Sequence, residues 1–174
     1  MSRLELSFVT EASLGSQAIR WFTHSDFSHV DIITPDGHRL GARSDHPVRP
    51  HDPVKPRGVF GDMYTHKVAG VQKRAMDYAK FTLDKRLVIE CSAAQARGAY
   101  AWLYDQLGKP YDKRGLFASF LFDRPVPWYD ERAWWCSELA TVFVHNAGFP
   151  ACRTPASRVS PNDCYIYAGC FAKP

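Results

Sequence analysis

The sequence has neither a long apolar run nor a pair of closely spaced cysteines. No stretch approaches the roughly 20 apolar residues that a membrane-spanning helix requires, so we expect no transmembrane segment. The opening residues MSRLELSFVTEASLG lack the basic and apolar regions of a signal peptide. The five cysteines include no CxxC pair, and their number is odd. These absences predict a cytoplasmic protein with reduced thiols rather than a disulfide scaffold.

An excess of charge of one sign is also missing. Lys and Arg together number 22 against 18 Asp and Glu, and the surplus of four is dispersed along the chain. We therefore expect no nucleic-acid partner. Cys and His residues are not grouped in closely spaced ligand pairs, so we expect no metal, and no motif indicates a cofactor. The sequence leaves the oligomeric state open.

The composition is that of an ordinary globular protein, with 45% hydrophobic and 23% charged residues. A chain of 174 residues can bury a sizeable core, so we predict one domain over residues 1–174. Residues 45–61 hold four prolines and little periodicity. They indicate a proline-rich loop or insertion at about 45–66.

Alternating and β-branched stretches predict strands at residues 3–9, 69–74 and 85–91, and a hairpin of residues 30–34 and 39–42 around Pro35-Asp36-Gly37. A short helix is expected within 13–26, with Ile19, Trp21 and Phe22 on its apolar side. Further helices are expected after the cap residue Ser92, over 136–146, and from Ser160-Pro161. The fold class is α+β, with a small antiparallel sheet packed against a central cysteine-bearing helix.

Cys136 is the first residue of that central helix. Unpaired backbone N–H groups and the helix dipole favour a negative charge there, which lowers the pKa of a thiol. The same N–H groups can stabilise an oxyanion during acyl transfer. Glu138, in the first turn, is interpreted as mainly structural. The alternative for Cys136 is a small buried hydrophobic residue without chemistry.

His29 begins a predicted strand, in the segment DFSHVDIIT. A histidine held at a strand end can accept a proton from a thiol and return it to a leaving group. The alternative is a hydrogen-bonded hairpin histidine. Spacing alone does not bring His29 to Cys136.

Three segments, IRWFTHSDFSHVDIITPDG, LGKPYD and WWCSELATVFVHNAG, resemble the permuted NlpC/P60 papain-like family of the YiiX/YebB type. In that family the histidine strand precedes the cysteine helix. The resemblance implies a permuted papain-like fold, with Cys136 as nucleophile, His29 as base and hydrolysis through an acyl-enzyme. It also implies that Tyr111 lines the cleft. Trp135 could form part of the wall of a substrate groove.

The third catalytic group is the point of departure from the family. Related enzymes place a polar residue about twelve positions after the histidine, and that position is Gly41 here. Asp31, Ser44, Asp45 or a backbone carbonyl could orient the imidazole instead.

The leading hypothesis is a cysteine amidase or peptidase acting on a peptide or another amide, such as the stem peptides of peptidoglycan. Without an export signal, that substrate would be reached in a phage-encoded or lysis-linked setting. The alternatives are a non-catalytic binding or phage-assembly module on the same fold, and a lipid or thioester acyl hydrolase or transferase.

Overall fold

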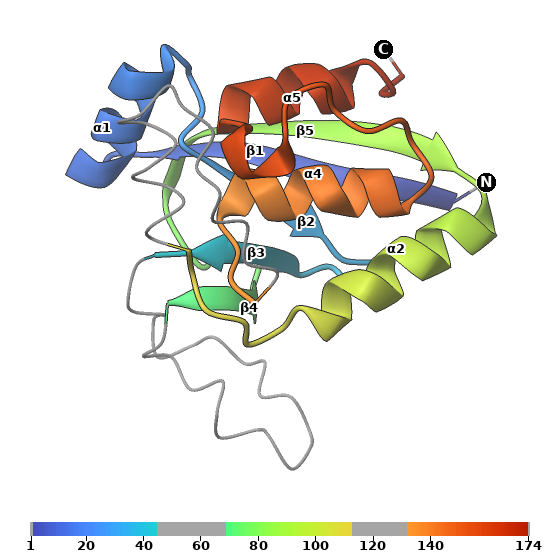
Figure 1. The fold of residues 1–174 in the computed structure, drawn as a ribbon. Coiled ribbons are helices and arrows are strands. Elements are labelled where there is room, and N and C mark those ends of the chain that lie inside the picture. The colour runs from blue at the N-terminus through green and yellow to red at the C-terminus, as the bar shows by residue number, and fades with distance from the viewer. Residues whose placement is uncertain (1, 45–68, 113–131, 174) are drawn as a thin grey trace.

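The computed structural model describes residues 2–44, 69–112 and 132–173. In this part of the chain, a five-stranded antiparallel sheet in the order β4-β3-β2-β1-β5 carries four α-helices (Figure 1). The strands are β1 (Ser2–Glu11), β2 (His29–Ile33), β3 (Arg39–Arg43), β4 (Gly70–Arg74) and β5 (Phe81–Cys91). The helices are α1 (Leu14–Thr23), α2 (Ala93–Asp105), α4 (Cys136–Asn146) and α5 (Pro161–Gly169), with a 3₁₀ turn η2 (Ala156–Arg158).

One face of the sheet forms the hydrophobic core. Leu4, Leu6 and Phe8 alternate along β1 and are fully buried, and Leu6 and Phe8 pair with Ile32 and Val30 of β2. Helix α4 lies across this face, with α5 on one side of it and α2 on the other (Figure 1). Because α4 is covered on several sides, most of its residues are buried. The expectation of a central buried helix on an antiparallel sheet is confirmed.

The helix ends follow local sequence signals. Ser92 and Ser160 cap α2 and α5, and each forms a capping box with the residue three positions later. Pro161 fills the first turn of α5. By contrast, Trp135 precedes α4 without any side-chain cap, so no side chain of the N-cap residue occupies the first N–H groups of that helix.

Helix α1 is present, but the side that carries Trp21 and Phe22 does not face the core. Their exposed fractions are 71% and 51%, and Leu14 is 83% exposed. The helix docks instead through Ser16, its one buried residue, whose hydroxyl donates to the Ser28 hydroxyl at 2.7 Å. A polar contact at the sheet edge therefore orients α1 and leaves its aromatic side in solvent.

The other face of the sheet is polar, although much of it is buried. Arg39 is 2% exposed, and it donates to the Ser7 hydroxyl at 2.7 Å and to the Asp84 carboxylate at 2.5 Å. Its Nε donates to the carbonyl of Met76, in the connection from β4 to β5. Buried charges need partners of this kind, since an unpaired one costs several kcal/mol.

The predicted hairpin forms as β2 and β3, and the predicted strand 85–91 starts earlier, at Phe81. In the described residues, no helix has the length and apolar character needed to cross a membrane. The proline-rich segment at 45–66 lies outside the described residues.

Candidate functional site

Cys136 is the first residue of α4, and backbone N–H groups from β2 and α4 lie close to its sulfur. The Sγ atom accepts hydrogen bonds from the N–H groups of Val30 and Ser137 and contacts the ring of His29. The residue is 5% exposed. The thiol is therefore held by one strand and one helix end, and it faces polar donors rather than apolar side chains alone.

His29 brings β2 to this sulfur. It is the first residue of the strand, and its ring is hydrogen-bonded to Cys136 on one side. Its Nε2 donates to Oδ1 of Asp31 at 2.8 Å. That bond leaves Nδ1 as the ring nitrogen available to the sulfur. A thiol, an imidazole and a carboxylate thus form a chain of three, two of them on one strand.

The electrostatics of this chain favour an ion pair. Burial lowers the pKa of His29, but the charges of Asp31 and Cys136 outweigh burial and raise it to about 9. Burial raises the pKa of Cys136, whereas the neighbouring imidazolium and the two backbone N–H groups lower it below the ordinary value. These shifts favour a thiolate beside an imidazolium over the neutral thiol and imidazole.

Asp31 is itself fixed by the polar face of the sheet. Tyr78 donates its hydroxyl to Oδ2 at 2.9 Å, and Arg39 lies 3.6 Å from the same oxygen. Burial raises the pKa of Asp31, but His29, Arg43 and Arg39 hold it well below its usual range. The carboxylate stays ionised, so it can stabilise a protonated His29.

Gly41 explains why Asp31 can reach the imidazole. Gly41 lies across from Asp31 on β3, and a Cβ at this position would stand 2.3 Å from the Asp31 Oδ1 atom. No real Cβ tolerates such a contact. The missing side chain at the expected orienting position therefore makes the space that the Asp31 carboxylate occupies.

A cleft of about 200 Å³ opens onto the cysteine and histidine. Polar side chains are numerous in its lining, although apolar atoms make up the larger part of the lining surface. The lining residues come from β1, α1, β2, β3, the segment after α2 and the start of α4: Glu11, Ser13, Gly15, Ser16, Ile19, Ser28, His29, Ala42, Arg43, Ser44, Tyr111 and Cys136. Two of the lining residues form a partly buried charge pair, since Arg43 donates to the Glu11 carboxylate at 2.6 Å.

Tyr111 reaches the cleft because its backbone is held between two segments. Its N–H donates to the carbonyl of Ala69 beside β4, and it bridges to Trp134 just before α4. Gly70 permits the approach, since a Cβ there would lie 2.4 Å from the carbonyl oxygen of Lys109. The expected position of Tyr111 in the cleft lining agrees with this geometry.

Three other expected residues have different outcomes. Trp135 is 1% exposed and does not line the cleft, so its predicted role in a groove wall is wrong. Trp135 directly precedes the buried helix α4, and its side chain is buried with that helix. Ser44 is exposed and lines the cleft, but within the described residues no hydrogen bond joins it to His29. Asp45 lies outside the described residues.

No family model matches the sequence, and no curated protein gives a significant match. All five cysteines are free thiols. In the described ranges, no three His, Cys, Asp or Glu side chains are grouped so that they could hold a metal ion.

The sequence does not reveal the role of Tyr78 or the burial of Glu138. Tyr78 lies in a segment without clear periodicity, and only its contact with Asp31 identifies it. Glu138 is an acidic residue in the first turn of α4, a position where such residues are usually exposed, yet it is 3% exposed. Its burial and then the nearby Asp112 raise its pKa to about 8, against a hydrogen bond from the Trp135 N–H. Glu138 is therefore neutral at pH 7 and does not repel the thiolate.

Replacing Glu138 with Gln tests this assignment through the pH dependence of stability. The folded-state pKa is raised from 4.5 to about 8, so folding binds a proton and this residue's contribution falls as pH rises from about 4.5 to 8. We expect Glu138→Gln to gain about 1 kcal/mol or more over the wild type between pH 5 and pH 8, measured by urea unfolding. Glu90→Gln, a change on the surface of β5, is the control. An equal difference at both pH values would contradict a neutral Glu138.

Proposed function

We propose that this protein is a cysteine hydrolase that cleaves amide bonds through an acyl-enzyme. The observation that carries the proposal is the buried chain from Cys136 through His29 to Asp31, of which Cys136 and His29 line a cleft. A cysteine kept only for packing needs none of these partners, and the other buried thiol, Cys164, has its pKa raised by burial to about 12.

The chemistry follows from the ion pair. The Cys136 thiolate attacks the carbonyl carbon, and the carbon–nitrogen bond breaks as the His29 imidazolium gives its proton to the leaving amine. Water then attacks the thioester, His29 takes a proton from this water, and the acid leaves as the Cys136 sulfur is released. Asp31 holds the ring and stabilises its charged form, so it is a positioning residue in both halves.

The start of α4 supplies the place for the oxyanion. The helix has no side-chain cap, and its first N–H groups lie beside the nucleophile. A negatively charged oxygen formed next to Cys136 would be stabilised by these donors and by the helix dipole.

Membership of the permuted NlpC/P60 papain-like family is part of this proposal. The order of the elements supports it, since the histidine strand β2 precedes the cysteine helix α4. Gly41 lacks the polar side chain that the family has at this position. The Asp31 carboxylate, on the neighbouring strand, occupies the space that such a side chain would fill. The orienting group therefore comes from the histidine's own strand in this protein.

The cleft favours a short polar substrate. The Ser13 hydroxyl lines the cleft, and the Glu11–Arg43 pair places both charges beside the nucleophile. These groups suit the amides and charged ends of a peptide better than an acyl chain. Stem peptides of peptidoglycan are the substrate class we propose first.

One observation favours a second candidate, a lipid or thioester acyl hydrolase or transferase. Helix α1 contributes Ile19 to the cleft and exposes Leu14, Trp21 and Phe22 on its outside. A helix with exposed aromatic and aliphatic residues is typical of binding to a lipid surface. The charged pair and the hydroxyl in the cleft argue for the amide, and a substrate comparison decides between the two candidates.

The test is hydrolysis of matched substrates followed by mass spectrometry. We expect cleavage of a stem peptide, a covalent adduct on Cys136 in the quenched mixture, and at least about 10³-fold loss of turnover in Cys136→Ala. Cleavage of an acyl thioester or phospholipid, without cleavage of the peptide, would favour the second candidate. If a protein with a reactive Cys136 thiolate turned over none of these substrates, the result would favour a non-catalytic binding module.

A further inference from the structure

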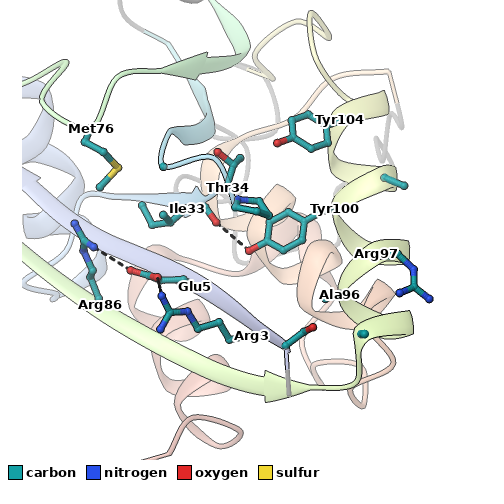
Figure 2. Close-up of a pocket in the computed structure, with 15 residues that line it drawn as sticks. Arg3, Glu5, Ile33, Thr34, Met76, Arg86, Ala96, Arg97, Tyr100 and Tyr104 are labelled. Carbon is teal, nitrogen blue, oxygen red and sulfur yellow. Dashed lines mark hydrogen bonds and ion pairs between the residues drawn. The ribbon is translucent and has the colours of Figure 1, made fainter.

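A second and larger cavity lies at the opposite end of β2 from the cysteine. Its volume is about 800 Å³, and Ile33, the last residue of β2, lines it (Figure 2). His29 begins the same strand, so the two sites are separated by roughly 13 Å along it. No residue lines both cavities. The larger cavity is therefore not an extension of the catalytic cleft.

The walls of this cavity are apolar because α2 presents small residues to the sheet. Ala93, Ala96 and Ala101 line it and leave room that longer side chains would fill. Tyr100 closes one side, and its hydroxyl donates to the carbonyl of Ile33 at 2.9 Å (Figure 2). That bond fixes the ring and uses its hydroxyl, so the ring offers an apolar surface. Met76 lines the cavity as well.

The polar residues of the cavity carry an excess of positive charge. Three guanidinium groups, those of Arg3, Arg86 and Arg97, line it together with the single carboxylate of Glu5. Arg86 donates to Glu5 at 3.0 Å, and Arg3 lies 4.0 Å from the other carboxylate oxygen (Figure 2). Within residues 2–44, 69–112 and 132–173, no side chain pairs with Arg97. One acid thus balances only one of three bases.

We propose that this cavity binds an amphipathic organic acid, which is an apolar ring or chain bearing one carboxylate. The apolar body would pack on Ile33, Tyr100 and the alanines of α2. The carboxylate would accept hydrogen bonds from the guanidinium groups at the rim, which match its geometry. A cation is disfavoured by the excess of positive charge. The volume lies in the range of small-molecule sites.

The test uses a fluorescent acid and its neutral counterpart on the Cys136→Ala protein, in which no acyl-enzyme can form. We expect naphthalene-2-acetate to bind saturably at one site per chain, at least tenfold more tightly than naphthalene-2-ethanol. The difference should shrink as salt is added, because the rim charges are partly exposed. This outcome does not depend on whether the protein is a hydrolase.

Two substitutions at exposed positions of α2 locate the site. Arg97→Gln is expected to weaken binding of the acid at least threefold without changing binding of the alcohol. Ala101→Trp places an indole in the cavity wall and is expected to weaken binding of both. Arg153→Gln removes the same charge at an exposed position outside the lining and should change neither. Thermal melts confirm that each variant folds. No saturable binding at millimolar acid, equal binding of acid and alcohol, or unchanged binding in Ala101→Trp overturns the proposal.

Discussion

Replacing Asp31 with Asn is expected to slow alkylation of Cys136 at pH 6 by about 100-fold, because the thiolate is the reacting form. The Asp31 charge is the largest of the influences that raise the pKa of His29 against its burial. With a neutral amide beside it, the imidazole loses its proton near neutral pH, and burial then keeps the sulfur protonated. Hydrolysis of a substrate should fall further, by about 10³- to 10⁴-fold, since the ring also loses its orientation.

The same substitution is expected to cost about 2 kcal/mol of unfolding free energy, because Tyr78 loses a charged acceptor in a buried site. Arg39 retains Asp84 and Arg43 retains Glu11, which limits the loss. Asp36→Asn is the control, on the turn of the same hairpin, where the side chain is 50% exposed and pairs with Lys73. Asp31→Asn with wild-type alkylation kinetics would show that the carboxylate does not govern the ion pair.

Replacing Gly41 with Ala is expected to be nearly as damaging, although it adds a single methyl group. The new Cβ would overlap Oδ1 of Asp31 and approach the carbonyl oxygen of Val30 at 3.3 Å. The carboxylate or the strand must move, at a cost of about 1–3 kcal/mol. Oδ1 of Asp31 is the oxygen that accepts the hydrogen bond from His29. The alkylation rate of Cys136 at pH 6 should therefore fall as well, by about tenfold or more.

Gly98→Ala is the matched control. Gly98 lies in α2 with no atom near the position of a new Cβ, so this change should stabilise the protein by about 0.5–1 kcal/mol. Urea unfolding gives both values, and alkylation of Cys136 followed by peptide mapping gives the rates. If Gly41→Ala keeps both stability and thiol reactivity, Gly41 is not the residue that makes room for Asp31.

The sequence predicts the elements of this fold well where periodicity and end signals agree. The helix caps at Ser92 and Ser160 and the turn after Thr34 are formed by hydrogen bonds to residues nearby in the chain. Each can therefore be predicted from its local sequence. The position of Cys136 at a helix start and of His29 at a strand start follows from the same signals. Their meeting across 107 positions of chain depends on packing, and only the family resemblance indicated it in advance.

The sequence does not predict features that depend on how segments far apart in the chain pack against each other. Side chains two residues apart on a strand share a face but are seldom positioned to bond, so Asp31 is a weak candidate until Gly41 is known to lie opposite it. The exposure of Trp21 and Phe22 has a similar origin. The helix pattern marks an apolar side, but Ser16 decides which side faces the sheet.

The pH dependence of Cys136 alkylation, with and without His29, tests the central claim most directly. The wild-type thiol should react with iodoacetamide faster than the other four at pH 6, with a midpoint below an ordinary thiol pKa of about 8.5. In His29→Ala the reaction at pH 6 should become slow and the midpoint should move above that value, because burial then acts alone. Equal labelling of all five cysteines, or an unchanged profile in His29→Ala, would show that no ion pair forms at this site.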